Sequence, residues 1–150
     1  MEVTVSWTGS SGAQSGMGFL AETESGHAFM MDGAPNETTP ELGGRNLAPR
    51  PLETVLAGTG GCSAYDVVLI LRRGRHDVRS CSVKLTAERA ATDPKVFTRI
   101  QMHFKVSGKG IPEAAVDRAV AMSRDKYCSA SAMLAKTAEI LTSFELDETA

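Results

Sequence analysis

Apolar and polar residues alternate along the N-terminal part of the chain, and this pattern predicts β-strands. The first predicted strand covers residues 2–9, and its apolar side chains share one face: Val3, Val5 and Trp7. Residues 17–23 and 26–33 show two further short alternating stretches. We therefore predict an antiparallel meander within residues 1–33.

The next segment, residues 34–50, holds Pro35, Pro40 and Pro49 together with Gly43 and Gly44. It is predicted to be a long loop, of a length that is often functional in small domains. Residues 51–73 follow as a long helix that starts with Pro51 at its first position. Its apolar residues occur on all sides, which is typical of a buried helix. Small residues near its middle would let another element pack closely, and Gly74 is placed to end it.

Alternation returns in the C-terminal region, residues 77–147. Residues 77–90 and 95–108 predict a β-hairpin, residues 112–126 and 127–136 predict two helices, and residues 137–147 predict a last strand. The apolar positions of the hairpin fall on one face of each strand: Cys81, Val83 and Leu85, then Ile100, Met102, Phe104 and Val106. Strands and helices are segregated, so we predict one α+β domain over residues 1–150 rather than repeated βαβ units.

Charge and composition exclude several function classes. The chain has 150 residues with 42% hydrophobic content and a formal net charge of −2, which gives no electrostatic case for a nucleic-acid or membrane-surface partner. The apolar run at residues 55–71 is interrupted by glycines and Asp66, and we expect it to be too short and too broken to span a membrane. No secretion signal opens the sequence, so a cytoplasmic location is expected.

The sequence contains three cysteines and three histidines, all far apart. An odd number of cysteines argues against a disulfide framework, and no spacing supports a zinc site. Cys81 falls on the inward face of a strand and is predicted to be structural. Cys128 lies near the start of a short helix, with Ser129 or Ser131 as the expected N-cap, where a helix dipole and the nearby Arg124 and Lys126 would lower a thiol pKa.

Cys62 follows Gly60 and Gly61 in the middle of the long helix. The glycines either serve helix packing or open a pocket over the sulfur, and the residues alone leave both interpretations open. Glu53 lies nine residues earlier, which places it on the opposite face of a straight helix from Cys62.

Two motifs taken together resemble a known family. The segment "PLETVLAGTGGCSAYDVVLIL" followed by "RAVAMSRDKYCSASAML", with their cysteines 66 residues apart, resembles the OsmC/Ohr family of thiol-dependent hydroperoxide reductases, and in particular its OsmC-like branch. The resemblance covers nearly the whole chain. It implies an OsmC-like α+β fold in which antiparallel sheets wrap two long central helices of an intertwined homodimer.

The resemblance also implies a chemistry. Cys62 would attack an organic hydroperoxide and become a sulfenic acid, and Cys128 would resolve it as a disulfide that an external dithiol reduces. No metal, haem or flavin cofactor is implied. Glu53 matches the family's glutamate, whereas "FMMDG" places Asp32 where the family has an arginine, and Arg45 or Arg50 of the loop could substitute for it.

A second interpretation stays open beside the peroxidase. An OsmC-like module without catalysis could bind an apolar or acyl ligand, or sense the redox state through the same cysteines. The ligand would occupy the same pocket at the dimer interface, and the absence of the family's arginine at Asp32 and the expected apolar lining of that pocket favour this interpretation.

Overall fold

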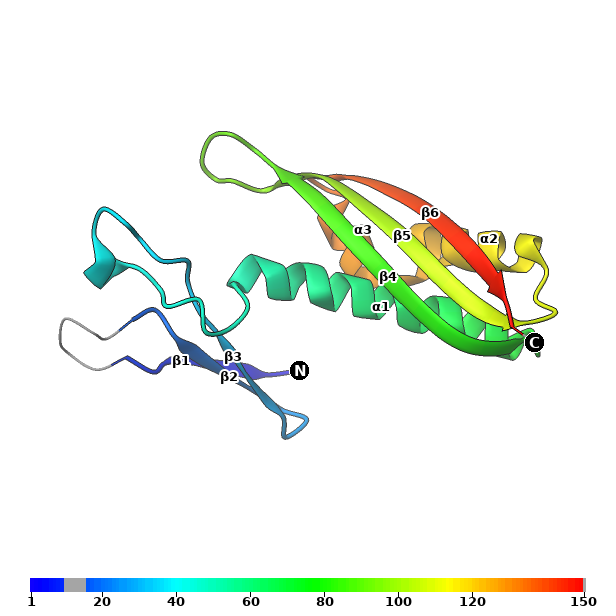
Figure 1. The fold of residues 1–150 in the computed structure, drawn as a ribbon, viewed down its shortest axis with the longest axis horizontal. Helices are drawn as coiled ribbons and strands as arrows, with labels where there is room; N and C mark the ends of the chain where they lie inside the picture. Colours follow the sequence, from blue (N-terminus) through cyan, green and yellow to red (C-terminus); the bar gives the residue numbers. More distant parts are fainter. Residues whose placement is uncertain (10–15, 150) are drawn as a thin grey trace. The chain divides into compact units, whose positions relative to one another are not determined.

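The computed structural model describes residues 1–9 and 16–149. The chain divides into two compact units, Met1–Val55 and Leu56–Ala150, which are described separately (Figure 1).

The N-terminal unit is built on a three-stranded antiparallel sheet in the order β1-β2-β3. Its strands are β1 (Val3–Trp7), β2 (Phe19–Thr23) and β3 (Ala28–Met31), which confirms the predicted meander. The apolar face of β1 is not covered within the unit, because the side chains of Val3, Val5 and Trp7 are each about half exposed. The loop that follows β3 includes a short 3₁₀ turn, Pro40–Leu42.

Helix α1 (Pro51–Arg73) begins as the sequence predicts. Pro51 is its first residue, and the Glu53 carboxylate accepts a hydrogen bond of 2.8 Å from the Arg50 backbone N–H, which is half of a capping box. The C-terminus differs from the expectation. Gly74 is not the left-handed residue there, because Arg75 carries the positive φ of 61°. The N–H groups of Arg75 and His76 then return to the carbonyls of Arg72 and Leu71, which forms a Schellman motif: 2.9 and 3.1 Å.

Only one face of α1 is buried within the single chain, so burial on all sides stays a prediction that depends on the second chain of the expected homodimer. The buried residues form a stripe that starts with the neighbours Thr59 and Gly60 and continues about one turn at a time through Ser63, Val67 and Leu71. Gly60 is packed as predicted, since a Cβ there would lie 2.6 Å from Leu85 Cδ1 of the neighbouring strand. Gly58 and Gly61 instead face open space, and Tyr65 is 69% exposed.

The expectation that the apolar segment is too short to span a membrane is wrong for α1 as a whole. With 23 residues the helix is long and apolar enough to cross a bilayer by length and composition alone, a test that core helices of soluble proteins also pass. Its buried stripe packs in the protein core, so length does not distinguish the two cases here.

The second sheet has the order β4-β5-β6 and belongs to the C-terminal unit. Strands β4 (Asp77–Arg89) and β5 (Phe97–Lys109) form the predicted antiparallel hairpin. Strand β6 (Glu139–Glu148) pairs with β5 in parallel, so this sheet is mixed rather than wholly antiparallel as expected. The α+β class is confirmed, but it contains one crossover that the pattern of elements did not predict.

The crossover runs through α2 (Glu113–Met122), a π-helical turn (Ser123–Tyr127) and α3 (Ser129–Leu134). Figure 1 shows α1, α2 and α3 on the same face of the β4-β5-β6 sheet. The core between them is formed by residues of all these elements, including four fully buried residues of β5: Ile100, Met102, Phe104 and Val106. This core fixes the position of α1 against the segment between α2 and α3.

Candidate functional site

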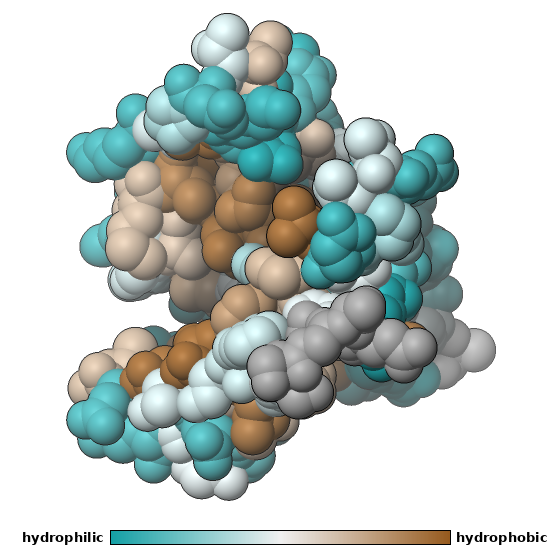
Figure 2. Space-filling view, turned by 90° about the vertical axis from the view of Figure 1, so that its left-hand side faces the viewer, coloured by the Kyte–Doolittle hydropathy of each residue, from teal (hydrophilic) through white to brown (hydrophobic). Residues whose placement is uncertain are grey.

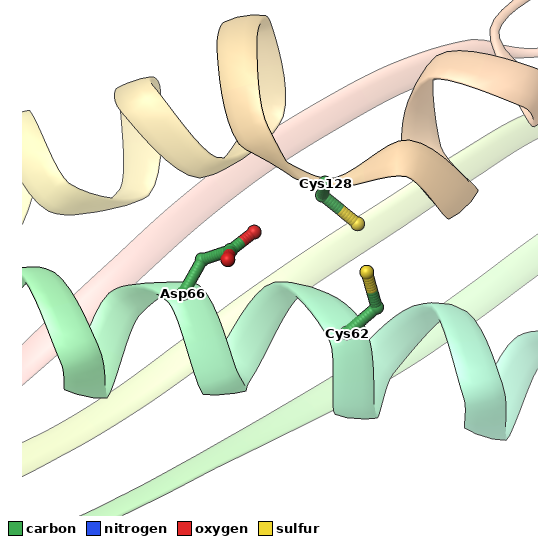
Figure 3. Close-up of side chains that lie close together, drawn as sticks. All are labelled: Cys62, Asp66 and Cys128. Carbon is green, nitrogen blue, oxygen red and sulfur yellow. The ribbon is translucent and has the colours of Figure 1, made fainter.

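Cys62 and Cys128 lie next to each other in the C-terminal unit, although the sequence separates them widely. Cys62 projects from the middle of α1, and Cys128 projects toward it from the segment between the π-helical turn and α3 (Figure 3). Asp66, one turn after Cys62 on α1, completes the group. The two sulfurs and a carboxylate oxygen of Asp66 all lie within 4.8 Å of one another.

Backbone geometry holds the Cys128 sulfur in place. The Cys128 N–H donates to the Ser123 carbonyl at 2.9 Å, the i→i−5 bond of the π-helical turn, and turns of this kind are frequent at functional sites. Cys128 is itself the N-cap of α3, which corrects the expectation that Ser129 or Ser131 caps this helix. Its Sγ accepts hydrogen bonds from the Ser131 N–H at 3.4 Å and the Ser131 hydroxyl at 3.2 Å, and the residue is 2% exposed.

A buried pair of serines joins α1 to the π-helical turn beneath the sulfurs. The hydroxyls of Ser63 and Ser123 are 2.8 Å apart, and both residues are fully buried. The Ser123 hydroxyl also lies 3.3 Å from Asp66 Oδ2 and 3.2 Å from the Ser63 carbonyl. These small polar side chains let the two segments approach closely while every hydroxyl keeps a partner.

The surroundings of Cys62 oppose its ionisation. Burial raises the pKa of the Cys62 thiol, and the neighbouring Cys128 sulfur and Asp66 carboxylate raise it further. A hydrogen bond from the Ala130 backbone N–H acts in the other direction and favours the thiolate. Cys62 is therefore a partly buried thiol whose reactivity depends on competing neighbours.

The two cations that the sequence placed near Cys128 are engaged elsewhere. The Arg124 guanidinium pairs with the Asp125 carboxylate at 2.6 and 2.9 Å and donates to the Thr142 hydroxyl at 3.0 Å. The Lys126 ammonium lies 5.3 Å from the centre of the Tyr127 ring. The Arg124 and Lys126 charges therefore take part in ion-pair and cation–π contacts with Asp125 and Tyr127 rather than in a contact with the Cys128 sulfur.

Four of the predicted site residues belong to the N-terminal unit and take part in contacts there. The Asp32 carboxylate accepts three backbone N–H groups that order the loop: Gly33 at 2.7 Å, Arg45 at 3.0 Å and Leu47 at 3.0 Å. These bonds, led by that from Leu47, hold the pKa of Asp32 below its usual value despite its burial. Arg50 and Glu53 form the N-cap contact of α1, so catalytic roles for these residues remain predictions.

Cys81 occupies a different environment from the other two cysteines. It lies on β4 opposite Val106 and, as predicted, packs with Val83 and Leu85 against the core of the C-terminal unit. Burial raises the pKa of its thiol. Its position is that of a structural cysteine.

Sequence analysis identified Cys62 and Cys128 but missed Asp66, Ser123 and Ser131. The signal for Asp66 was available, because residues four apart on a helix share a face, so Asp66 had to lie beside Cys62. Ser131 was noted only as a candidate N-cap, whereas it is the residue that donates to the N-cap sulfur of Cys128. Ser123 gave no signal, since its contacts depend on the π-helical turn and on the approach of α1.

Comparison with known proteins places these residues within a family. The sequence model for a family described as OsmC-like protein matches residues 43–143. The protein YhfA of Escherichia coli K12 is 44% identical over 146 residues, which cover 97% of this chain and 98% of that protein.

Two solved structures show the same fold. A hypothetical protein from Aquifex aeolicus is 28% identical with a TM-score of 0.78, and the match covers 99% of this chain and 97% of that one. An organic hydroperoxide resistance protein OsmC from Legionella pneumophila is 18% identical with a TM-score of 0.66, covering 97% of each chain.

Proposed function

Since the chain belongs to the OsmC-like protein family, we propose that it is a thiol-dependent peroxidase that reduces organic hydroperoxides in oxidative stress defence. One observation carries the proposal: Cys62 and Cys128 hold their sulfurs within 4.8 Å of each other, close enough for a small movement to join them. The name of the Legionella pneumophila protein, organic hydroperoxide resistance protein, supports the choice of substrate.

In the proposed reaction, Cys62 reacts with the peroxide first and Cys128 reacts with the oxidised Cys62 second. The Cys62 thiolate attacks the outer oxygen of the hydroperoxide, the O–O bond breaks, and an alcohol leaves with a proton while Cys62 becomes a sulfenic acid. The Cys128 sulfur then attacks the Cys62 sulfur, a disulfide forms and water leaves. An external dithiol reduces this disulfide by exchange and is itself oxidised to a disulfide.

The N–H groups around the sulfurs suit these steps. The Ala130 N–H on the Cys62 sulfur stabilises the attacking thiolate, and the Ser131 donors on the Cys128 sulfur do the same for the resolving step. In the proposed reaction, Arg45 or Arg50 supplies the positive charge that lowers the Cys62 pKa during attack. Glu53 orients the guanidinium of that arginine. Asp32 is assigned the ordering of the loop that carries Arg45.

We also propose that two copies of the chain form an intertwined homodimer in the cytoplasm. Large apolar side chains are exposed on both units, among them Val5, Trp7 and Tyr65, and Figure 2 shows hydrophobic surface on the face it displays. Gly58 and Gly61 leave the outer face of α1 free for close approach by a second helix. Light scattering of the purified chain is expected to give the mass of two chains, and the mass of one would contradict this part.

A binding module without catalysis is the second candidate, and two observations favour it. Burial and the Asp66 carboxylate both raise the pKa of Cys62, which lowers the fraction of thiolate at neutral pH. In addition, the N-terminal unit has an open cavity of about 400 Å³ whose lining is mixed: Met17, Met30 and Leu47 are apolar, and Asp32 and Arg45 are charged. Such a lining would suit an acyl ligand with a polar head better than a wholly apolar ligand.

Peroxide consumption separates the two candidates. Full-length protein with cumene hydroperoxide and a dithiol is expected to consume the peroxide, whereas Cys62→Ser should fall to the uncatalysed background. Cys81→Ser is the matched control and should keep the wild-type rate, because Cys81 touches neither sulfur. Equal rates for wild type and Cys62→Ser would exclude the peroxidase and favour the binding module.

A further inference from the structure

Cys62, Asp66 and Cys128 have the residue types and the placement of three ligands of a metal ion. They form the one group of at least three potential ligands brought together among residues 1–9 and 16–149. Sequence spacing gave no hint of it, because the third ligand lies far along the chain from the other two. We propose that in the reduced protein Cys62 Sγ, Cys128 Sγ and an Asp66 carboxylate oxygen bind a Zn²⁺ ion, and that this ion competes with the peroxide for the same two sulfurs.

The distances fit such an ion. Zn²⁺ binds thiolate sulfur at about 2.3 Å and carboxylate oxygen at about 2.0–2.2 Å in tetrahedral geometry, so two sulfur ligands lie roughly 3.8 Å apart. The three ligand atoms here lie within 4.8 Å of one another, and rotation of the side chains can close the remaining gap. Cys62 and Asp66 stand one helical turn apart on α1, the same spacing as paired ligands of helical zinc sites.

The ligand set selects the metal. Two thiolates and one carboxylate suit Zn²⁺ or a softer ion, whereas Mg²⁺ and Ca²⁺ require oxygen ligands. Only three protein ligands are present, and Cys62 and Asp66 are partly exposed, so a water molecule or another small ligand can take the fourth position.

Groups around the three ligands are arranged as supports. The Ser131 N–H and hydroxyl point at the Cys128 sulfur, the Ala130 N–H acts on the Cys62 sulfur, and the Ser123 hydroxyl lies 3.3 Å from Asp66 Oδ2. Such outer contacts orient ligands and stabilise their charge. The two thiolates and the Asp66 carboxylate would repel one another at this separation, and a doubly positive ion among them turns that repulsion into attraction.

The competition with peroxide follows from the chemistry of the sulfurs and rests on the proposed function, whereas the binding itself does not. A Zn²⁺-bound thiolate uses the electron pair that would attack the peroxide. When a hydroperoxide does react, the two thiolates give two electrons to the O–O bond and form the disulfide. An alcohol and a water molecule are released after uptake of two protons, and Zn²⁺ leaves because its sulfur ligands are gone.

Binding is tested first on the metal-free, fully reduced full-length chain, by titration with Zn²⁺ in competition with a chromophoric chelator. One ion per chain is expected. Cys62→Ser and Cys128→Ser should each weaken binding by at least about 100-fold, and Asp66→Asn, which keeps the side-chain size, by roughly 10–100-fold. Cys81→Ser should bind as wild type does.

Substitution with Co²⁺ gives a second readout that does not depend on affinity. Wild type and Cys81→Ser should show the sulfur-to-cobalt charge-transfer band, and Cys62→Ser should show a clearly weaker band per bound ion, because one of the two thiolate ligands is gone. Absence of stoichiometric Zn²⁺ binding, or binding that Asp66→Asn and Cys62→Ser leave unchanged, would overturn the site.

The peroxide assay separates this inference from the proposed function. Protein loaded with Zn²⁺ should consume cumene hydroperoxide more slowly, in proportion to the bound fraction, and a chelator should restore the rate. Peroxide reduction without Zn²⁺ binding would reject the metal site and leave the peroxidase standing. Zn²⁺ binding without peroxide reduction at any metal level would support the site and reject the competition together with the peroxidase.

Discussion

Cys62 and Cys81 lie in the same unit, are both partly buried, and have pKa values raised by burial, yet their neighbours differ. Cys81 packs with apolar side chains of β4 on the core, and burial alone accounts for its shift. Cys62 has a second sulfur, a carboxylate and a backbone N–H donor around it. The groups in contact with the sulfur, rather than its burial or exposure, therefore distinguish a reactive cysteine from a structural one.

The largest difference between Cys62 and Cys81 is expected when Cys128, the proposed resolving cysteine, is removed. Cys128→Ser leaves the Cys62 sulfenic acid without a neighbouring thiol, so the sulfenic acid should accumulate as nearly all of the protein after one equivalent of cumene hydroperoxide. Labelling with dimedone followed by mass spectrometry should find the adduct on Cys62. Wild type should show little adduct, and an adduct on Cys81 in either protein would break the distinction between the two sites.

The next effect comes from the carboxylate. Asp66→Asn removes a negative charge that raises the Cys62 pKa, so the thiolate fraction at neutral pH should rise and alkylation by iodoacetamide should accelerate by roughly ten-fold or less. For wild type, the midpoint of the rate profile should lie at higher pH than that of an ordinary thiol, and the variant should shift that profile to lower pH.

Cys81 supplies the control for this experiment, because its pKa shift has no contribution from Asp66. The alkylation profile of Cys81, followed by peptide mass spectrometry in the same samples, should be the same in both proteins. A Cys62 profile that does not move, or that moves to higher pH, would contradict the electrostatic role of Asp66.

The smallest expected effect concerns stability. The Cys128 sulfur caps α3 by accepting the Ser131 N–H, and serine is a good N-cap, so Cys128→Ser should be more stable than Cys128→Ala by about 1 kcal/mol. At Cys81 the order should reverse, because a serine hydroxyl would face an apolar core without a partner. Urea unfolding of the four variants measures both differences, and the same order at both positions would contradict the assigned environments.

Much of the fold could be predicted because local patterns determine it. The alternation in β4 and β5 gave both strands and the buried face of Ile100, Met102, Phe104 and Val106. Pro51 gave the start of α1. The parallel pairing of β6 with β5 was not predicted, since the alternation within a strand shows which face is buried but not the direction of its neighbour.

The limits of the prediction at α1 have the same physical origin. Gly58, Gly60 and Gly61 look equivalent in the sequence, yet only Gly60 lies against Leu85, because the contact depends on which side of the helix meets β4. The candidate site shows the same division. Resemblance to a family predicted both cysteines. The Ser63–Ser123 contact and the capping role of Cys128 were not predicted, because they depend on a π-helical turn that no sequence pattern indicates.

We propose that Cys62 and Cys128 form a redox pair within one chain, and mapping of the disulfide after a single oxidation tests this pairing. Fully reduced full-length protein is treated with one equivalent of cumene hydroperoxide, alkylated, digested and analysed by mass spectrometry. One product is expected, in which the peptides containing Cys62 and Cys128 are joined by a disulfide and Cys81 is alkylated. A disulfide that includes Cys81, or three cysteines that all remain alkylated after the peroxide is consumed, would contradict it.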